Sequence, residues 1–308
     1  MSLSWTRRFS VAPSTVAGIA IGRSQVCAVV LDAKAQACEM RGLYQHDLAT
    51  ALFVGPPTPE AEAALAAALQ SVGAELRAAF AAVHVALPDT AIRSTVFELD
   101  ELPKTADLRE ALLRWRFAKE WQRPEESLEC RGLDLGADQG KRLFFGQAGD
   151  RPWLDCVRRA LARAEITSWS LNAAASYRFN HFHQAIAGGE GALLSLDPDC
   201  WNLLHWDAAG RVRRVFARLR TNTRTEDEMK LIADDVERAI LAYGRGGSQP
   251  GNLYLAGSET ETAALMVLLE HRLHRQAMPL QAGKGIAGAS AGTREGLAPL
   301  AMAAALAA

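Results

Sequence analysis

The sequence has no hydrophobic run long enough to cross a membrane. A spanning helix needs about 20 consecutive apolar residues, whereas the best apolar stretch, residues 297–308, is shorter and contains Pro299. A second run, residues 16–21, is too short for the core of a signal peptide and suits a β-strand better. We therefore expect a soluble protein without a direct membrane span.

Cysteine and histidine are too scattered to suggest a metal site. The five cysteines form no C-x-x-C pair, and the histidines lack metal-ligand spacing. The number of cysteines is odd and four of the five sit in apolar runs, which is typical of buried thiols in a reducing compartment. The sequence therefore predicts a cytoplasmic protein with no metal ligands.

Neither sign of charge is in excess. Lysine and arginine together number 34 and the acidic residues 35, so the formal net charge is -1. Nothing in this balance attracts the chain to nucleic acid or to anionic lipid. We therefore expect neither to be a direct partner.

The order of predicted elements indicates two lobes. The chain has 308 residues, about twice the length of a typical domain. The order strand–strand–strand–helix–strand–helix occurs twice along it, and Gly188 and Gly189 separate the two copies. This pattern predicts an α/β protein whose first lobe spans residues 1–187 and whose second lobe spans residues 188–308.

The first lobe contains additional elements over about residues 88–150. Three predicted strands and one helix in this range have no counterpart in the second lobe, so we expect a small inserted α+β subdomain. The helix, predicted over residues 105–121, carries Leu108, Leu112 and Trp115 on one face and charged side chains on the other.

Several short motifs resemble those of a known fold. Residues 18–24, Gly-Ile-Ala-Ile-Gly-Arg-Ser, resemble the first phosphate turn of actin-like ATPases, and residues 255–259, Leu-Ala-Gly-Ser-Glu, resemble their adenosine turn. Residues 85–91, 112–115 and 235–243 are similar to segments of PilM-like type IV pilus assembly proteins and MshI-like pilus proteins, which are related to the cytoplasmic domain of GspL in type II secretion. The resemblance implies a two-lobed actin-like ATPase (ribonuclease H-like) fold with an inserted subdomain.

The same resemblance implies where a nucleotide would bind. A nucleotide in this fold lies between the lobes, and the matching positions are Gly22, Arg23, Ser24, Asp197, Gly257 and Ser258. Plain turns between strands and a helix N-cap explain these residues as well, so both interpretations stay open.

Three departures from the family pattern predict that catalysis is lost. Ala20 stands where the family carries aspartate. In the second turn Pro198 removes a backbone N–H, and Asp199 adds negative charge where a phosphate would lie. We expect no catalytic residues and no cofactor. ATP with Mg²⁺ is the one cofactor whose binding should still be tested.

The resemblance further implies a scaffold in a pilus or related secretion machine. Such a scaffold docks the cytoplasmic tail of a PilN-like inner-membrane protein in a groove between the first lobe and the insertion, which places it at the inner membrane through partners. An assembly ATPase is a further candidate partner. The rival functions are an active ATPase or small-molecule kinase of the same fold, and a ligand-sensing regulator.

Aromatic and basic residues of the insertion are the candidates for binding this tail. Tryptophan is enriched at interface hot spots, and arginine pairs with carboxylates. The candidates are Trp115, Trp121, Arg93, Arg114 and Arg116. The alternative is that both tryptophans fill the small core of the insertion.

Overall fold

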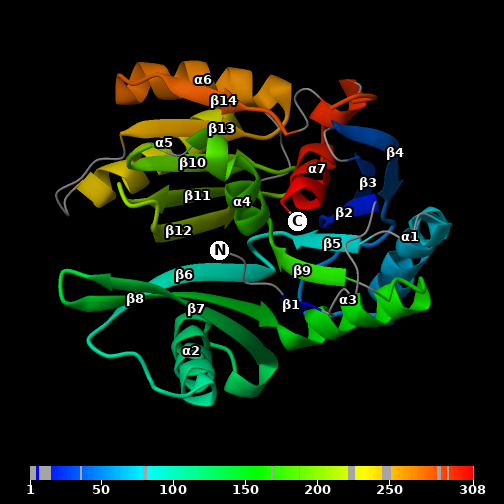
Figure 1. The fold of residues 1–308 in the computed structure, drawn as a ribbon, viewed down its shortest axis with the longest axis horizontal. Helices are drawn as coiled ribbons and strands as arrows, with labels where there is room; N and C mark the ends of the chain where they lie inside the picture. The colour runs from blue at the N-terminus through cyan, green and yellow to red at the C-terminus, as the bar shows by residue number, and fades with distance from the viewer. Residues whose placement is uncertain are drawn as a thin grey trace.

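The computed structural model describes residues 5–6, 15–34, 37–78, 82–167, 169–186, 188–220, 226–244, 251–282, 286–289 and 291–307. Within these residues the chain forms three β-sheets. Figure 1 shows two lobes, each with its own sheet, and a smaller third sheet beneath them.

The first lobe is a six-stranded sheet in the order β1-β9-β5-β2-β3-β4. One half of it is an antiparallel meander of β2 (Thr15–Ile21), β3 (Gln25–Lys34) and β4 (Ala37–Asp47), with β4 at the edge. Strands β5 (Ala82–Leu87) and β9 (Trp169–Ala173) run parallel to β2, and β1 (Trp5–Thr6) pairs with β9 at the edge. Helices α1 (Pro59–Ala78) and α3 (Arg151–Arg163) bury one face of this sheet.

Helix α7 (Ala298–Leu306) covers the opposite face of the first sheet, although it ends the described chain. It follows the short 3₁₀ helix η2 (Ala291–Arg294) and consists of small and apolar residues that are almost all buried. It comes so close to β2 that a Cβ on Gly18 would lie 1.9 Å from the carbonyl oxygen of Ala301. Gly18, in the motif that resembles a phosphate turn, is therefore required for helix packing.

The second lobe is a five-stranded sheet in the order β12-β11-β10-β13-β14. Helices α5 (Glu226–Gly244) and α6 (Glu259–Leu273) bury one face, and α4 (Ala174–Ile186) packs on the other. The strands are β10 (Gly191–Leu196), β11 (Cys200–Trp206), β12 (Val212–Leu219), β13 (Asn252–Ala256) and β14 (Ala277–Leu280). Since α4 also packs against α7 beside the first sheet, it lies between the two lobes (Figure 1).

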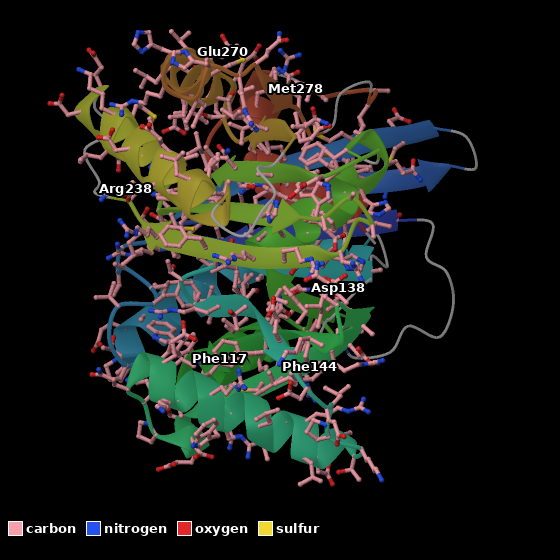
Figure 2. The ribbon with its side chains drawn as sticks, turned by 90° about the vertical axis from the view of Figure 1, so that its left-hand side faces the viewer. Phe117, Asp138, Phe144, Arg238, Glu270 and Met278 are labelled. Carbon is pink, nitrogen blue, oxygen red and sulfur yellow. The ribbon has the colours of Figure 1, made fainter. Side chains whose placement is uncertain are left out.

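Residues 92–150 form the insertion, a sheet separate from both lobes. Strands β6 (Ile92–Leu99), β8 (Lys141–Asp150) and β7 (Leu128–Asp138) are antiparallel in that order, with α2 (Ala106–Trp121) across one face and the 3₁₀ helix η1 (Glu125–Ser127) between α2 and β7. Phe117 of α2 and Phe144 of β8, both labelled in Figure 2, belong to the core between this helix and the sheet. A Cβ on Gly146 would lie 2.6 Å from Leu113 Cδ2, so this glycine lets α2 approach the strands.

The face of the insertion sheet opposite α2 packs against the second lobe. Leu135 and Phe145 contact Val212 and Val215 of β12. Beside them Asp138, at the tip of the β7–β8 hairpin, forms ion pairs with two arginines of the second lobe (Figure 2). We call this pairing of Asp138 with Arg211 and Arg213 the hairpin clasp. The insertion therefore touches both lobes.

The structure bears out the predicted architecture and shows which side of the insertion helix is buried. Leu108 and Trp115, predicted on one face of this helix, are 58% and 50% exposed, whereas Leu113 and Phe117 are buried. The predicted division at residues 187–188 falls between α4 and β10, and it stays a prediction about separate folding units. In the described part of the chain, no helix combines the length and hydropathy that a membrane crossing requires.

Candidate functional site

The turn between β2 and β3 is bound by a carboxylate of the chain itself. Gly22 N–H donates to the Gln25 carbonyl at 2.8 Å and closes the hairpin. The next amide, Arg23 N–H, donates to Asp199 Oδ2 at 2.5 Å. A Cβ on Gly22 would lie 2.7 Å from that same oxygen, so the glycine makes room for the carboxylate. This is the contact that a phosphate oxygen would make if the turn held a nucleotide.

The turn between β10 and β11 uses its other acid in a buried ion pair. Both oxygens of Asp197 accept hydrogen bonds from the Arg178 guanidinium of α4, at 2.5 and 2.9 Å. The two side chains are 4% and 1% exposed. In this bidentate pair, both carboxylate oxygens accept hydrogen bonds from arginine. Asp197 therefore fastens α4 to the second sheet.

Arg220, which the sequence did not single out, completes this buried network. Its side chain is fully buried and donates to the Asp197 carbonyl at 2.9 Å. It also pairs with Glu228 at 2.9 Å and with Glu261 at 2.8 Å. Burial by itself lowers the pKa of Arg220, but the two carboxylates outweigh it and raise that pKa above its ordinary value. Arginine at a strand end is ordinary in sequence, so only the fold reveals this role.

Asp89 links the first lobe to α4 and to the second lobe. It follows β5 and is fully buried, and its carboxylate accepts the Ala175 N–H at 3.1 Å and the Asn202 side-chain amide at 2.8 Å. Burial, with the negative charge of Asp197 nearby, raises the pKa of Asp89 to about 7. The junction between the lobes is thus filled by hydrogen-bonded side chains of the chain itself.

A cavity of about 670 Å³ lies beside the turn that resembles the adenosine turn. Ser258 there is the N-cap of α6, and its hydroxyl accepts the Glu261 N–H. Gly257 allows close packing, because a Cβ on it would lie 2.8 Å from the Leu196 carbonyl oxygen. The charged lining residues are Glu226, Glu261 and Glu295, with no lysine or arginine among the described lining residues. Such a lining offers phosphate groups no cationic partner.

A second, smaller cavity lies where the first lobe meets the insertion. It measures about 140 Å³, and its described lining residues are Phe53, Gly55, Thr90, Ala91, Arg93, Trp121, Arg123, Asp150 and Trp153. The Trp153 indole donates to the Gly55 carbonyl at 2.7 Å and packs against Phe53, with ring centroids 5.0 Å apart. Aromatic rings and charged side chains thus meet in a space large enough for one side chain. We call it the junction cavity.

The structure brings together two of the five candidate tail-binding residues. The Arg93 guanidinium lies over the Trp121 ring, 4.6 Å from its centroid, in the junction cavity. Trp115 is exposed on the outer side of α2, Arg114 pairs with Glu110 of the same helix, and Arg116 stacks over Phe97. The remaining aromatic and basic lining residues, Phe53, Arg123 and Trp153, were not predicted, because they come from loops and helices distant in sequence.

Comparison with known proteins identifies the fold. No protein-family model matches the chain, and no curated protein matches it in sequence. A solved structure described as the PilM-PilN type IV pilus biogenesis complex superposes with a TM-score of 0.74 at 15% identity, covering 95% of this chain and 97% of that chain. A protein from Bacteroides thetaiotaomicron with an actin-like ATPase fold and unknown function gives 0.56 at 10% identity, covering 94% and 95%.

A third structure is the cytoplasmic domain of EpsL, an inner-membrane component of the type II secretion system of Vibrio cholerae. It has a TM-score of 0.48 at 14% identity and covers 85% of this chain and 96% of that domain. The two closer superpositions each extend over more than nine tenths of both chains. The chain therefore has the actin-like ATPase fold, with an inserted subdomain in its first lobe.

Proposed function

We propose that this protein is a non-catalytic scaffold of a type IV pilus or related secretion machine, and that it docks the cytoplasmic tail of a PilN-like inner-membrane protein. The likeness in fold to the protein of a PilM-PilN complex supports the choice of machine. In this proposal the protein is cytoplasmic and reaches the membrane through its partners.

The observation that carries the proposal is the hydrogen bond from Arg23 N–H to Asp199. A bound nucleotide would have to displace this carboxylate from the turn, and the phosphates would then lie against its negative charge. The second acid is held by Arg178, which leaves no free carboxylate in that turn to direct a magnesium ion. The residues of both turns, as folded, do not fit a magnesium nucleotide.

The rival functions differ from the scaffold in how they treat nucleotide. An ATPase or kinase must turn over Mg-ATP, and a ligand-sensing regulator must bind a small molecule without turnover. The large cavity beside α6 is the observation that favours the regulator. Its described lining offers no lysine or arginine to an anionic ligand, so nucleotide is a poor candidate even in that role.

Two measurements test the proposal. Titration calorimetry and a phosphate-release assay with Mg-ATP should show neither binding nor turnover above a protein-free blank. Co-expression with a PilN-like inner-membrane protein should move the chain from the soluble to the membrane fraction, and deleting that protein's cytoplasmic tail should reverse the shift. Clear turnover by the unmodified protein, or an unchanged distribution with the intact partner, would overturn the scaffold.

A further inference from the structure

The junction cavity holds one positive charge that its own acid does not neutralise. Its charged lining residues are Arg93, Arg123 and Asp150. Arg123 Nη2 lies 3.0 Å from Asp150 Oδ2, so these two side chains neutralise one another. Arg93 forms no ion pair with any described residue, and the exposed Glu120 acts on it only through space. Since no described carboxylate contacts the Arg93 guanidinium directly, it can pair with an incoming anion.

A hydrogen-bond donor without an acceptor lies beside this charge. The Nε1 atom of Trp121 is buried and has no acceptor among the described residues. The Arg93 guanidinium stacks on the same indole ring, which fixes the position of both groups. Since Nε1 is covered by protein atoms, an incoming ligand meets the Arg93 guanidinium and not the indole N–H.

The size of the cavity selects the kind of acceptor. At about 140 Å³ it is well below the range of cavities that enclose a whole small ligand. A carboxylate on a short side chain fits this volume and can accept hydrogen bonds from the Arg93 guanidinium. Phe53 and Trp153 on the first-lobe wall then offer aromatic surface to the residues that flank the acid.

From these observations we infer that the junction cavity binds an aspartate or glutamate side chain of an extended peptide, with the carboxylate received by Arg93. This inference rests on the proposed docking function and specifies the chemistry of the docked tail. Arg114 pairs with Glu110 and Arg116 stacks over Phe97, and neither is among the described residues that line the cavity, so neither is needed for recognition.

The test uses a phage-displayed library of random dodecapeptides selected on the immobilised full chain. The selected peptides should share one acidic position with aromatic or aliphatic neighbours. Replacing that acid by its amide should weaken binding about tenfold or more in fluorescence anisotropy, which is the loss of one charge-assisted interaction.

Charge reversal provides the decisive comparison. Selection on Arg93→Glu should replace the acidic position by lysine or arginine. The matched control is Arg116→Glu, which makes the same change on α2 outside the cavity and should leave the selected pattern intact. Circular dichroism confirms that each variant is folded. Selected peptides without an acid, a pattern that Arg93→Glu leaves unchanged, a preference for phosphoserine over aspartate, or no enrichment at all would each overturn the inference.

The outcomes separate this inference from the scaffold function. If the partner's tail moves the chain to the membrane equally well with Arg93→Glu, docking stands and the carboxylate site is wrong. If acidic peptides bind through Arg93 but no inner-membrane tail does, the carboxylate site stands and the scaffold function is wrong.

Discussion

Replacing Asp197 by asparagine should destabilise the protein strongly. The substitution keeps the size of the side chain but removes the charge that faces Arg178, whose guanidinium is 1% exposed. Removing one partner of a buried ion pair costs about 3–5 kcal/mol, because the other charge stays buried without compensation. Asparagine retains one oxygen that can accept a hydrogen bond, so we expect the lower end, about 3 kcal/mol.

The sign of this effect distinguishes the two interpretations of Asp197. An acid kept for metal binding is commonly held at some cost to stability, and its removal leaves stability unchanged or raises it. If the acid instead fastens α4 to the second sheet, removing it must lower the stability of the folded protein. Equilibrium urea denaturation followed by circular dichroism measures the difference directly.

Two further variants serve as controls for this prediction. Glu226→Gln breaks an exposed pair with Lys230 by the same change of carboxylate to amide, and it should leave the denaturation midpoint where it is. The double variant Arg178→Met with Asp197→Leu replaces the pair by apolar side chains and should be less destabilised than the Asp197→Asn single variant. A midpoint for Asp197→Asn equal to that of the unmodified protein would refute the structural role.

Three other predictions follow from the junctions between the parts. Asp138→Asn removes both ion pairs of the hairpin clasp, and hydrogen exchange should become faster in the β7–β8 hairpin while rates in the first sheet stay the same. The pKa of Asp89 is raised in the folded protein from 3.8 to about 7, so the folded state binds this proton more tightly. Its contribution to stability should therefore be largest below about pH 4 and fall as the pH rises to about 7, and denaturation curves of Asp89→Asn across this interval should show a smaller pH dependence. Gly18→Ala would place its Cβ 1.9 Å from the Ala301 carbonyl oxygen, so the variant should unfold at markedly lower urea concentration, and an unchanged midpoint would show that α7 can move away.

The sequence predicted the architecture because its signals are local. The repeated order of strands and helices, the glycines before β10 and the extra elements of the insertion can all be recognised from neighbouring residues. The buried face of α2 could not be predicted, because both sides of that helix carry apolar residues at helical spacing. Whether the Leu108 or the Leu113 side of the helix is buried depends on Gly146, which lets Leu113 approach β8. Gly146 lies 33 positions after Leu113 in the chain.

The site was predictable only in part for the same reason. Negative charge at Asp199 was expected to oppose a phosphate, and the structure places that carboxylate on the first turn. The contact itself joins residues 176 positions apart, so no local pattern could have shown it. Arg220 belongs to no recognisable motif. Its role depends on two glutamates in the first turns of α5 and α6, with which it forms ion pairs.

The contacts at the lobe junction explain how an actin-like fold can serve as a binding platform. Asp89, Arg178 and Asp199 each join segments of different lobes or of α4, and each fills space between the lobes with a satisfied polar group. The hairpin clasp adds a further link between the insertion and the second lobe. A platform held in one arrangement loses little conformational entropy when a peptide binds, so more of the contact energy appears as affinity. In the scaffold we propose, the residues that fill the space between the lobes therefore support binding at the junction cavity.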